Sequence, residues 1–524
     1  MKAISAFRGL FMLAVLTSQG FPARAEEGGS ILIREVCLGP APRDIPENFA
    51  LSLDSKRVAY AVPHGQKTYV LVDGQADKEY DGISSLRLSP DGSRVAYAAQ
   101  RGRSQLVVVD GREGKEYDDA KAILFSSDGN HVAYQARRGA KWFVVVDGEE
   151  GQECDRLGEA LVFSPGSARV AYAAQRGTKW HVVLDGEEGK GYDEIETGSL
   201  RFSPDGKRLA YKAGKGLRWI VVLDGGEGQD YDGMEANSLL FSPDSKRVAY
   251  RAHRGGKQLV VSDGRESGEY DLIDNPTFSP DGKQLAYEAQ RGRKWRVVVE
   301  GREGPEYDNL GLRSLAFSPD GMRFAYVAFR GKARVVVVDG QEGKEYPGID
   351  GTNPPVFSPD SRRLAYMAQR KKWLCLAVVD GQERKPHHEV GLRTLVFSPD
   401  GTRVAYAAKH GRKWLAVVDE QEGKEYNAIE PASLPLLWRE PPDTPYSESF
   451  RQPDKGSLQF SPDGRHVVYA ARRGKASVIV VDGQESREYD ALLRGSALVF
   501  DGPSALHALV VANGQILRLE IALR

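Results

Sequence analysis

The feature that most constrains this chain is a unit of 37 to 40 residues that recurs along almost its whole length. Two well-kept copies are FSPDGKRLAYKA from Phe202 and FSPDGTRVAYAA from Phe397. The tyrosine of this string marks eleven copies between Tyr60 and Tyr469, with one longer step of 63 residues before the last. A twelfth, degenerate copy begins near Ala497 and runs to residue 524. A period of this length indicates a solenoid or a propeller.

One copy, residues 199–232, predicts four short antiparallel strands. Residues 199–203 alternate apolar and polar side chains, and the following Pro-Asp-Gly is turn chemistry. A second strand keeps small residues on one side, and residues 219–223 form a continuous apolar run, which is typical of a strand buried on both faces. Residues 229–232 can add a short outer strand. The predicted fold is therefore all-β: a β-propeller of about twelve four-stranded blades.

The number of rings is less constrained than the blade. Because single rings typically hold four to eight blades, we expect two six-bladed rings, with one large ring as the alternative. The last copy ends without an outer strand, and residues 31–36 are strand-like, so they can fill that gap and hold both chain ends in one blade. We divide the chain into a signal peptide (1–25), an N-terminal segment with this possible closing strand (26–46), repeats 1–10 (47–426), a Pro-rich insert (427–456) and repeats 11–12 (457–524).

The first residues predict export. Lys2 and Arg8 precede a short apolar run, and Ala23-Arg24-Ala25 places small residues at the two positions that a signal peptidase recognises. We expect cleavage near Ala25 and a periplasmic or secreted protein. No later apolar stretch is long enough to span a bilayer, so no membrane span is expected.

Composition excludes some classes. There are 72 Lys+Arg against 73 Asp+Glu, which argues against a nucleic-acid partner, because such proteins carry a large positive excess. The 3 cysteines are far apart, allow at most one disulfide and show no metal-ligand spacing.

The string F-S-P-D-G-x-R-[VL]-A-Y resembles the WD-repeat-like units of TolB-type bacterial propellers. This resemblance implies the propeller fold and covers the repeats only. TolB itself carries a folded α/β domain ahead of its blades, whereas about twenty residues separate Ala25 from the first repeat here, so the resemblance does not extend to a role in the Tol-Pal system. Propeller peptidases have similar blades, but the chain has no hydrolase domain and no G-x-S-x-G motif.

No catalytic constellation can be identified among near-identical units, so we expect no enzyme, cofactor or metal. The repeated Asp of S-P-D-G fits a structural turn better than a calcium loop. His387 and Glu389 can share a strand face, but a solvated outer strand is the simpler interpretation. Six tryptophans at the start of the third strand either pack between blades or offer stacking platforms: Trp142, Trp180, Trp219, Trp295, Trp373 and Trp414.

Charge follows the repeat. The turns between the second and third strands hold 26 Lys or Arg and no acidic residue, whereas the segments from the next turn to the tyrosine sum to −23. Because one strand joins the two sets, we expect a basic and an acidic face. Such a pattern is either a solubility feature copied by duplication or a surface for an anionic partner. The candidate partner-binding cations are Arg137, Arg138, Lys141, Arg472 and Arg473.

The insert at 427–456 is the clearest departure from the repeat. It holds six prolines together with Trp438 and Tyr446, which we take as further candidate partner-binding residues. Partner or ligand contact, packing across the ring and a flexible loop remain the alternatives.

These observations favour an exported, non-enzymatic propeller that binds a protein or an anionic envelope polymer through its loop faces. The alternative is a propeller enzyme, a lyase or hydrolase, with its site in the central channel near Arg87, Arg201 and Gln459. A third possibility is a self-associating protein whose basic and acidic faces stack.

Overall fold

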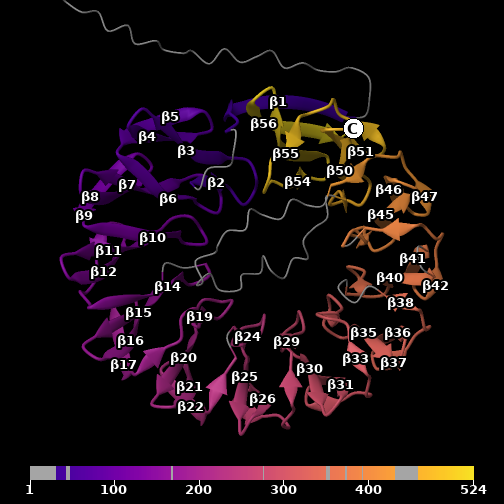
Figure 1. Cartoon of the computed structure of the whole chain (residues 1–524), viewed down its shortest axis with the longest axis horizontal. Helices are drawn as coiled ribbons and strands as arrows, with labels where there is room; N and C mark the ends of the chain where they lie inside the picture. Colours follow the sequence, from indigo (N-terminus) through magenta and orange to yellow (C-terminus); the bar gives the residue numbers. More distant parts are fainter. Residues whose placement is uncertain are drawn as a thin grey trace, which may run out of the picture.

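The computed structural model describes residues 31–42, 48–166, 169–235, 237–274, 276–349, 354–371, 374–391, 393–430 and 458–523. These residues form twelve small antiparallel sheets in one closed ring (Figure 1). Every regular element in the described ranges is a strand. The predicted all-β propeller of twelve four-stranded blades is confirmed. None of the described residues forms a helix long and apolar enough to cross a membrane.

Each blade runs from an innermost strand a, through strands b and c, to an outermost strand d. Strands b are β3 (Val58–His64), β7 (Val95–Arg101), β11 (Val132–Arg138), β15 (Val170–Arg176), β20 (Leu209–Lys215), β25 (Val248–Arg254), β30 (Leu285–Arg291), β35 (Phe324–Arg330), β40 (Leu364–Lys371), β45 (Val404–His410), β50 (Val467–Arg473) and β55 (Ala505–Ala512). Strands c are β4 (Lys67–Val72), β8 (Ser104–Val109), β12 (Lys141–Val146), β16 (Lys179–Leu184), β21 (Arg218–Leu223), β26 (Lys257–Ser262), β31 (Lys294–Val299), β36 (Ala333–Val338), β41 (Leu374–Val379), β46 (Lys413–Val418), β51 (Ala476–Val481) and β56 (Gln515–Leu523).

Strands d are β5 (Gln75–Tyr80), β9 (Arg112–Tyr117), β13 (Glu149–Glu150), β17 (Glu187–Tyr192), β22 (Gly226–Tyr231), β27 (Arg265–Glu266), β32 (Arg302–Glu303), β37 (Gln341–Glu342), β42 (Gln382–Glu383), β47 (Gln421–Glu422), β52 (Gln484–Glu485) and β1 (Ile31–Pro40). Strand a is a single piece in blades 1–4: β2 (Phe49–Leu51), β6 (Gly82–Leu88), β10 (Asp119–Phe125) and β14 (Arg156–Phe163).

From blade 5 onward, strand a consists of two short pieces with a loop between them. The pairs are β18 (Glu194–Ile195) and β19 (Arg201–Phe202), β23 (Gly233–Met234) and β24 (Leu240–Phe241), β28 (Leu272–Ile273) and β29 (Thr277–Phe278), β33 (Asn309–Leu310) and β34 (Ala316–Phe317), β38 (Gly348–Ile349) and β39 (Val356–Phe357), β43 (Glu389–Val390) and β44 (Val396–Phe397), β48 (Ala428–Ile429) and β49 (Gln459–Phe460), and β53 (Ala491–Leu492) and β54 (Val499–Gly502). The Pro-rich insert lies between β48 and β49, so it interrupts the innermost strand of blade 11.

The hydrophobic core is divided into twelve clusters, each shared by two consecutive blades. The cluster between blades 6 and 7, for example, joins Val260 and Tyr270 to Phe278, Leu285 and Tyr287. If the chain formed two six-bladed rings, blades 6 and 7 would belong to different rings and would share no core cluster. They do share one. The expectation of two rings is therefore wrong, and the alternative of one large ring is correct, because each blade presents the same apolar faces to its neighbours and the same packing step repeats until the chain closes.

Closure is achieved by the N-terminal strand, as the sequence predicts. β1 pairs antiparallel with β56 from Ile31 opposite Leu523 to Pro40 opposite Gln515, which supplies the missing strand d of blade 12 (Figure 1). Leu38, 3% exposed, joins the cluster that packs blade 12 against blade 1. The twelfth interface of the ring is thus built like the others.

The turns lie at the two ends of the ring, and each kind of turn lies at one end only. Most a–b turns are held by a Ser and an Asp, as in Ser89, whose hydroxyl donates to Asp91 at 2.5 Å. This confirms the structural turn predicted from S-P-D-G. The a–b and c–d turns lie at one end, and the b–c turns and the links to the next blade lie at the other, which we call the b–c face.

Candidate functional site

Most cations of the b–c face are neutralised within the ring. In blade 2, Arg101 pairs with Glu113 at 2.8 Å, and the same carboxylate accepts a hydrogen bond from Tyr80 of blade 1 at 3.0 Å. Arg101 and Tyr80 together lower the pKa of Glu113 to about 2. The arrangement recurs around the ring. At the junction of blades 11 and 12, Tyr489 and Arg487 both contact Glu35 of β1.

A second repeated contact fastens neighbouring b–c turns. Asp193 accepts from the ammonium of Lys179 at 2.6 Å and from the backbone N–H of Gly216 in the next blade at 2.8 Å. Lys179 and Gly216 lower the pKa of this carboxyl group. The carboxylates that follow the strand-d tyrosine therefore hold one blade to the next.

The predicted separation of a basic and an acidic face needs correction. The sequence prediction counts carboxylates that precede the strand-d tyrosine in the acidic set, but one of them, Glu79, lies opposite Tyr69 at the start of strand c, beside the b–c turn. There it pairs with His64 at 2.6 Å. The segment after the c–d turn runs back along strand c as far as the b–c turn, so its last acidic residues lie on the b–c face and neutralise it in part.

The candidate cations chosen from sequence all have partners. Arg138 pairs with Glu150 at 2.8 Å, Lys141 with Asp155 at 2.6 Å, and Arg472 with Glu430 at 3.4 Å. Arg473 pairs with Glu485 at 2.5 Å, and Arg137 lies over the ring of Trp142 at 5.8 Å. Their role in partner binding stays a prediction. Trp438 and Tyr446 lie outside the described residues, as do residues 1–25, where a signal peptide is predicted.

Exposed cations without an ion pair to a described residue also occur on this face. One stands at the b–c turn of blade 2, Arg103, and the longest consecutive run lies in blades 7 to 11. In five consecutive blades, 7 to 11, an exposed cation without an ion pair to a described residue stands at the b–c turn. We call this set the tip arc: Arg293, Lys332, Lys371, Arg412 and Lys475. In blades 3 to 6 the same turn carries neutral residues: Ala140, Thr178, Leu217 and Gly256. Exposed Arg313 and Arg494 on inner loops add positive charge to the same half of the ring.

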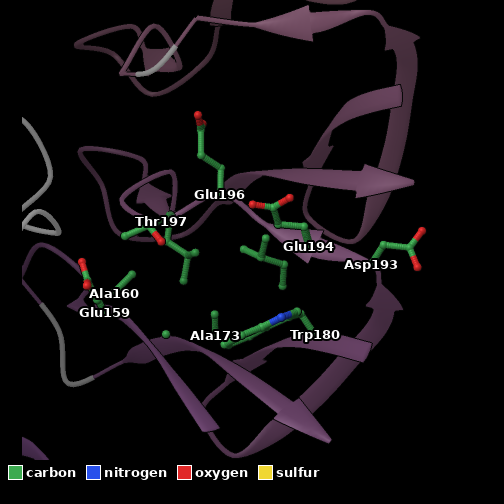
Figure 2. A pocket seen from close by; sticks show the side chains of 11 residues that line it. Glu159, Ala160, Ala173, Trp180, Asp193, Glu194, Glu196 and Thr197 are labelled. Carbon is green, nitrogen blue, oxygen red and sulfur yellow. The ribbon is translucent and has the colours of Figure 1, made fainter. Parts of the chain in front are cut away.

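The opposite half of the face contains a pocket of about 270 Å³ between blades 4 and 5. Ala173 and Trp180 form one side, and the segment that carries Glu194, Glu196 and Thr197 forms the other (Figure 2). Glu159 also lines it. The pocket thus combines an indole face with acidic side chains, which is an environment suited to an organic cation.

The pocket carboxylates differ in their partners. The Glu196 carboxylate pairs with Lys212 at 2.8 Å. Glu159 and Glu194 are exposed and form no ion pair with any described residue. These two therefore give the pocket an uncompensated negative potential.

The channel positions named by the sequence contact backbone rather than one another. The guanidinium of Arg87 donates to Leu86 O at 3.0 Å, that of Arg201 to Leu200 O at 2.9 Å, and the amide of Gln459 to Leu498 O at 2.7 Å. Burial lowers the pKa of Arg87. These side chains support strand a of their own or the next blade.

Two further expectations can be compared with the structure. His387 is 6% exposed and packs edge-on against Tyr406, so the solvated outer strand expected there is wrong. His387 takes the place of the strand-d tyrosine, which is buried in the blades that have it. Glu389 lies on β43 and pairs with Lys409 at 2.8 Å. Among the tryptophans, Trp142, Trp180 and Trp295 pack against inter-blade clusters, and Trp373 lies outside the described residues.

Comparisons with known proteins give partial structural likeness only. No family model and no curated protein matches the chain. Among solved structures, it is similar to a eukaryotic initiation factor (12% identity, 59% of this chain and 90% of that one, TM-score 0.35). It is also similar to TolB from Acinetobacter baumannii (18%, 50% and 77%, TM-score 0.22) and to the dihydro-heme d1 dehydrogenase NirN in complex with DHE (15%, 59% and 77%, TM-score 0.26).

Proposed function

We propose that the chain is a non-enzymatic binding propeller that docks an anionic partner, an acidic protein surface or an envelope polymer, on the tip arc. The observation that carries the proposal is the break in an otherwise repeated pattern of charge compensation. Blade after blade pairs its b–c cations with strand-d carboxylates, yet five consecutive blades each add one exposed cation that stays uncompensated. An array of this kind attracts and orients a negatively charged partner.

The cellular setting that we propose is the periplasm or the cell exterior. It rests on the leader at residues 1–25, with cleavage near Ala25. Kinship with TolB-type propellers is part of the proposal and rests on the F-S-P-D-G-x-R-[VL]-A-Y string. An envelope polymer or an acidic envelope protein is the partner that this setting offers.

The test is binding of immobilised dextran sulfate at several salt concentrations. We expect an affinity that falls steeply with salt, and a loss of at least tenfold when the five tip-arc residues are changed to Gln. The matched control changes five exposed cations of the opposite end to Gln: Arg112, Lys207, Lys246, Arg265 and Arg302. Equal weakening in both variants would show that net charge alone is responsible, and would overturn the proposal.

A channel enzyme is the second candidate, and one observation favours it. Glu288 is 6% exposed, and burial together with the nearby Asp274 raises its pKa to about 8. A carboxylic acid that keeps its proton at neutral pH is a common general acid. Turnover of glycan, ester or polyuronate substrates that is lost in Glu288→Gln would favour the enzyme, whereas absence of turnover with intact dextran sulfate binding would favour the binding protein.

A further inference from the structure

A run of buried polar side chains links consecutive blades beside the channel. At the position after the strand-b tyrosine, blades 3, 5 and 6 carry Gln135, Lys212 and Arg251, and each donates to a backbone carbonyl of the next blade. Blade 7 continues the run with Glu288, which contacts the backbone N–H of Leu315 in blade 8. Blade 4 interrupts the run, because its residue at this position is alanine, Ala173.

Lys212 shows what this position holds when it is filled. Its side chain is 1% exposed, its ammonium lies 2.8 Å from the Glu196 carboxylate, and it donates to the carbonyl of Glu235 in the next blade. Burial lowers the pKa of Lys212, and the Glu196 carboxylate opposes that shift. A lysine side chain thus lies between two blades with its charge paired and its ammonium hydrogen-bonded.

The pocket between blades 4 and 5 is the same position without the lysine. Glu196 and Glu235 are equivalent in the repeat, since the N–H of each donates to the carbonyl of the buried strand-b residue, Lys212 or Arg251. The Glu196 carbonyl therefore takes the place here that the Glu235 carbonyl has in the next blade. Ala173 ends at its Cβ, so about 270 Å³ stays open where blade 5 has a lysine side chain.

The lining supplies what an incoming side chain of that kind needs. Trp180 offers an indole face for methylene groups and for cation–π contact. Glu159 and Glu194 lie in the lining without a cation among the described residues. Gly158, which has no side chain, faces both Ala173 and Trp180, and this keeps the space clear.

We infer that this pocket binds a primary alkylammonium group, the side chain of a lysine presented by a ligand or the end of a free polyamine. The ammonium takes the place in blade 4 that the Lys212 ammonium has in blade 5, donates to the Glu196 carbonyl and is neutralised by Glu159 and Glu194. The inference is independent of the tip arc, which lies on other blades and recognises the opposite charge.

The experiment follows the Trp180 indole N–H by NMR, assigned by loss of its signal in Trp180→Phe. Titration uses acetyl-Gly-Lys-Gly-amide, the same peptide with an acetylated lysine, and 1,5-diaminopentane. We expect the lysine peptide or the diamine to shift the signal in a saturable way, and the acetylated peptide to leave it unchanged. Tighter binding of one of the first two identifies the source of the ammonium group.

Two variants test the mechanism. Ala173→Lys fills the pocket from within and abolishes the shift, whereas Thr178→Lys, which adds the same charge on the exposed b–c turn of that blade, does not. Should Ala173→Lys fail to fold, Glu159→Gln with Glu194→Gln, both exposed, must weaken binding at least tenfold. The inference is overturned if the lysine and acetyl-lysine peptides give the same response, or if neither peptide nor the diamine gives any. It is also overturned if the pocket variants bind as tightly as the wild type. If the proposed function also holds, all of these pocket variants bind dextran sulfate as the wild type does, because the tip arc is intact in each of them.

Discussion

At the position after the strand-b tyrosine, single residues change the chemistry of an inter-blade wall without changing the fold. Lys212 and Arg251 each face a carboxylate of their own blade, Glu196 and Glu235, at 2.8 and 3.3 Å. In blade 7 the corresponding pair is two acids, Asp274 and Glu288. The cation is absent there, so burial and the neighbouring carboxyl hold a proton on Glu288.

This pair makes the stability of the ring depend on pH. The folded-state pKa of Glu288, about 8, lies above that of an unfolded chain, so the folded state binds the extra proton and stability falls as pH rises from about 4.5 to 8. The groups that face it are Asp274, Tyr326 and the Leu315 N–H. Relative to Glu288→Gln, we expect the wild type to lose about 2–3 kcal/mol between pH 5.5 and 7.5, measured by urea unfolding. The same difference at both pH values would contradict this.

His388 gives a second prediction at this scale. It accepts the Gly411 N–H at 3.3 Å, where most blades use an aspartate for the same contact, as Asp193 does with Gly216 at 2.8 Å. His388→Asp restores a charge-assisted hydrogen bond across the junction of blades 9 and 10, so we expect a gain of about 0.5–1 kcal/mol in unfolding free energy. Asp193→His, the reverse change at the junction of blades 4 and 5, should cost a similar amount. A loss of stability in His388→Asp would refute this account.

At the scale of elements, β1 does for blade 12 what the local strand d does in every other blade. It completes the sheet, and Glu35 accepts from Tyr489 at 3.0 Å in the way that Glu113 accepts from Tyr80. The sequence predicted this strand because the last repeat stops after strand c. The four strands per blade and the turns were also predictable, because each of them depends on residues that are adjacent in the chain.

The closing strand predicts a large effect for a small change. Leu38→Ala leaves a cavity in the cluster between blades 12 and 1, so we expect a loss of about 2–4 kcal/mol in chemical unfolding. Leu53, 78% exposed on an a–b turn, is the matched control, and Leu53→Ala should change stability by less than about 0.5 kcal/mol. Equal effects of the two substitutions would mean that β1 does not hold the ring closed.

At the scale of the whole molecule, the sequence could not give the ring size or the site. The number of blades in the ring depends on the angle between packed blades, and this angle cannot be derived from the sequence of one repeat. The candidate arginines were chosen by charge alone, but Arg138 and Arg473 each have a carboxylate partner 12 residues further along, on strand d. The pocket did leave a trace, because Ala173 stands where its neighbouring blades carry Gln135 and Lys212.

A single closed ring also predicts that the chain can be cut and joined elsewhere. Ile31 lies opposite Leu523, just as Arg112 lies opposite Val109 on either side of the Asp110-Gly111 turn. An Asp-Gly linker from Leu523 to Ile31 therefore gives blade 12 the c–d turn of its neighbours, and new ends can be placed within 431–457. We expect this permutant to remain a monomer with unchanged circular dichroism and sedimentation coefficient, and to lose less than about 2 kcal/mol of stability. As a control, a permutant opened between Val144 and Val145, inside the buried strand β12, should fail to fold. If the first permutant aggregates as the control does, the two ends do not meet in one blade.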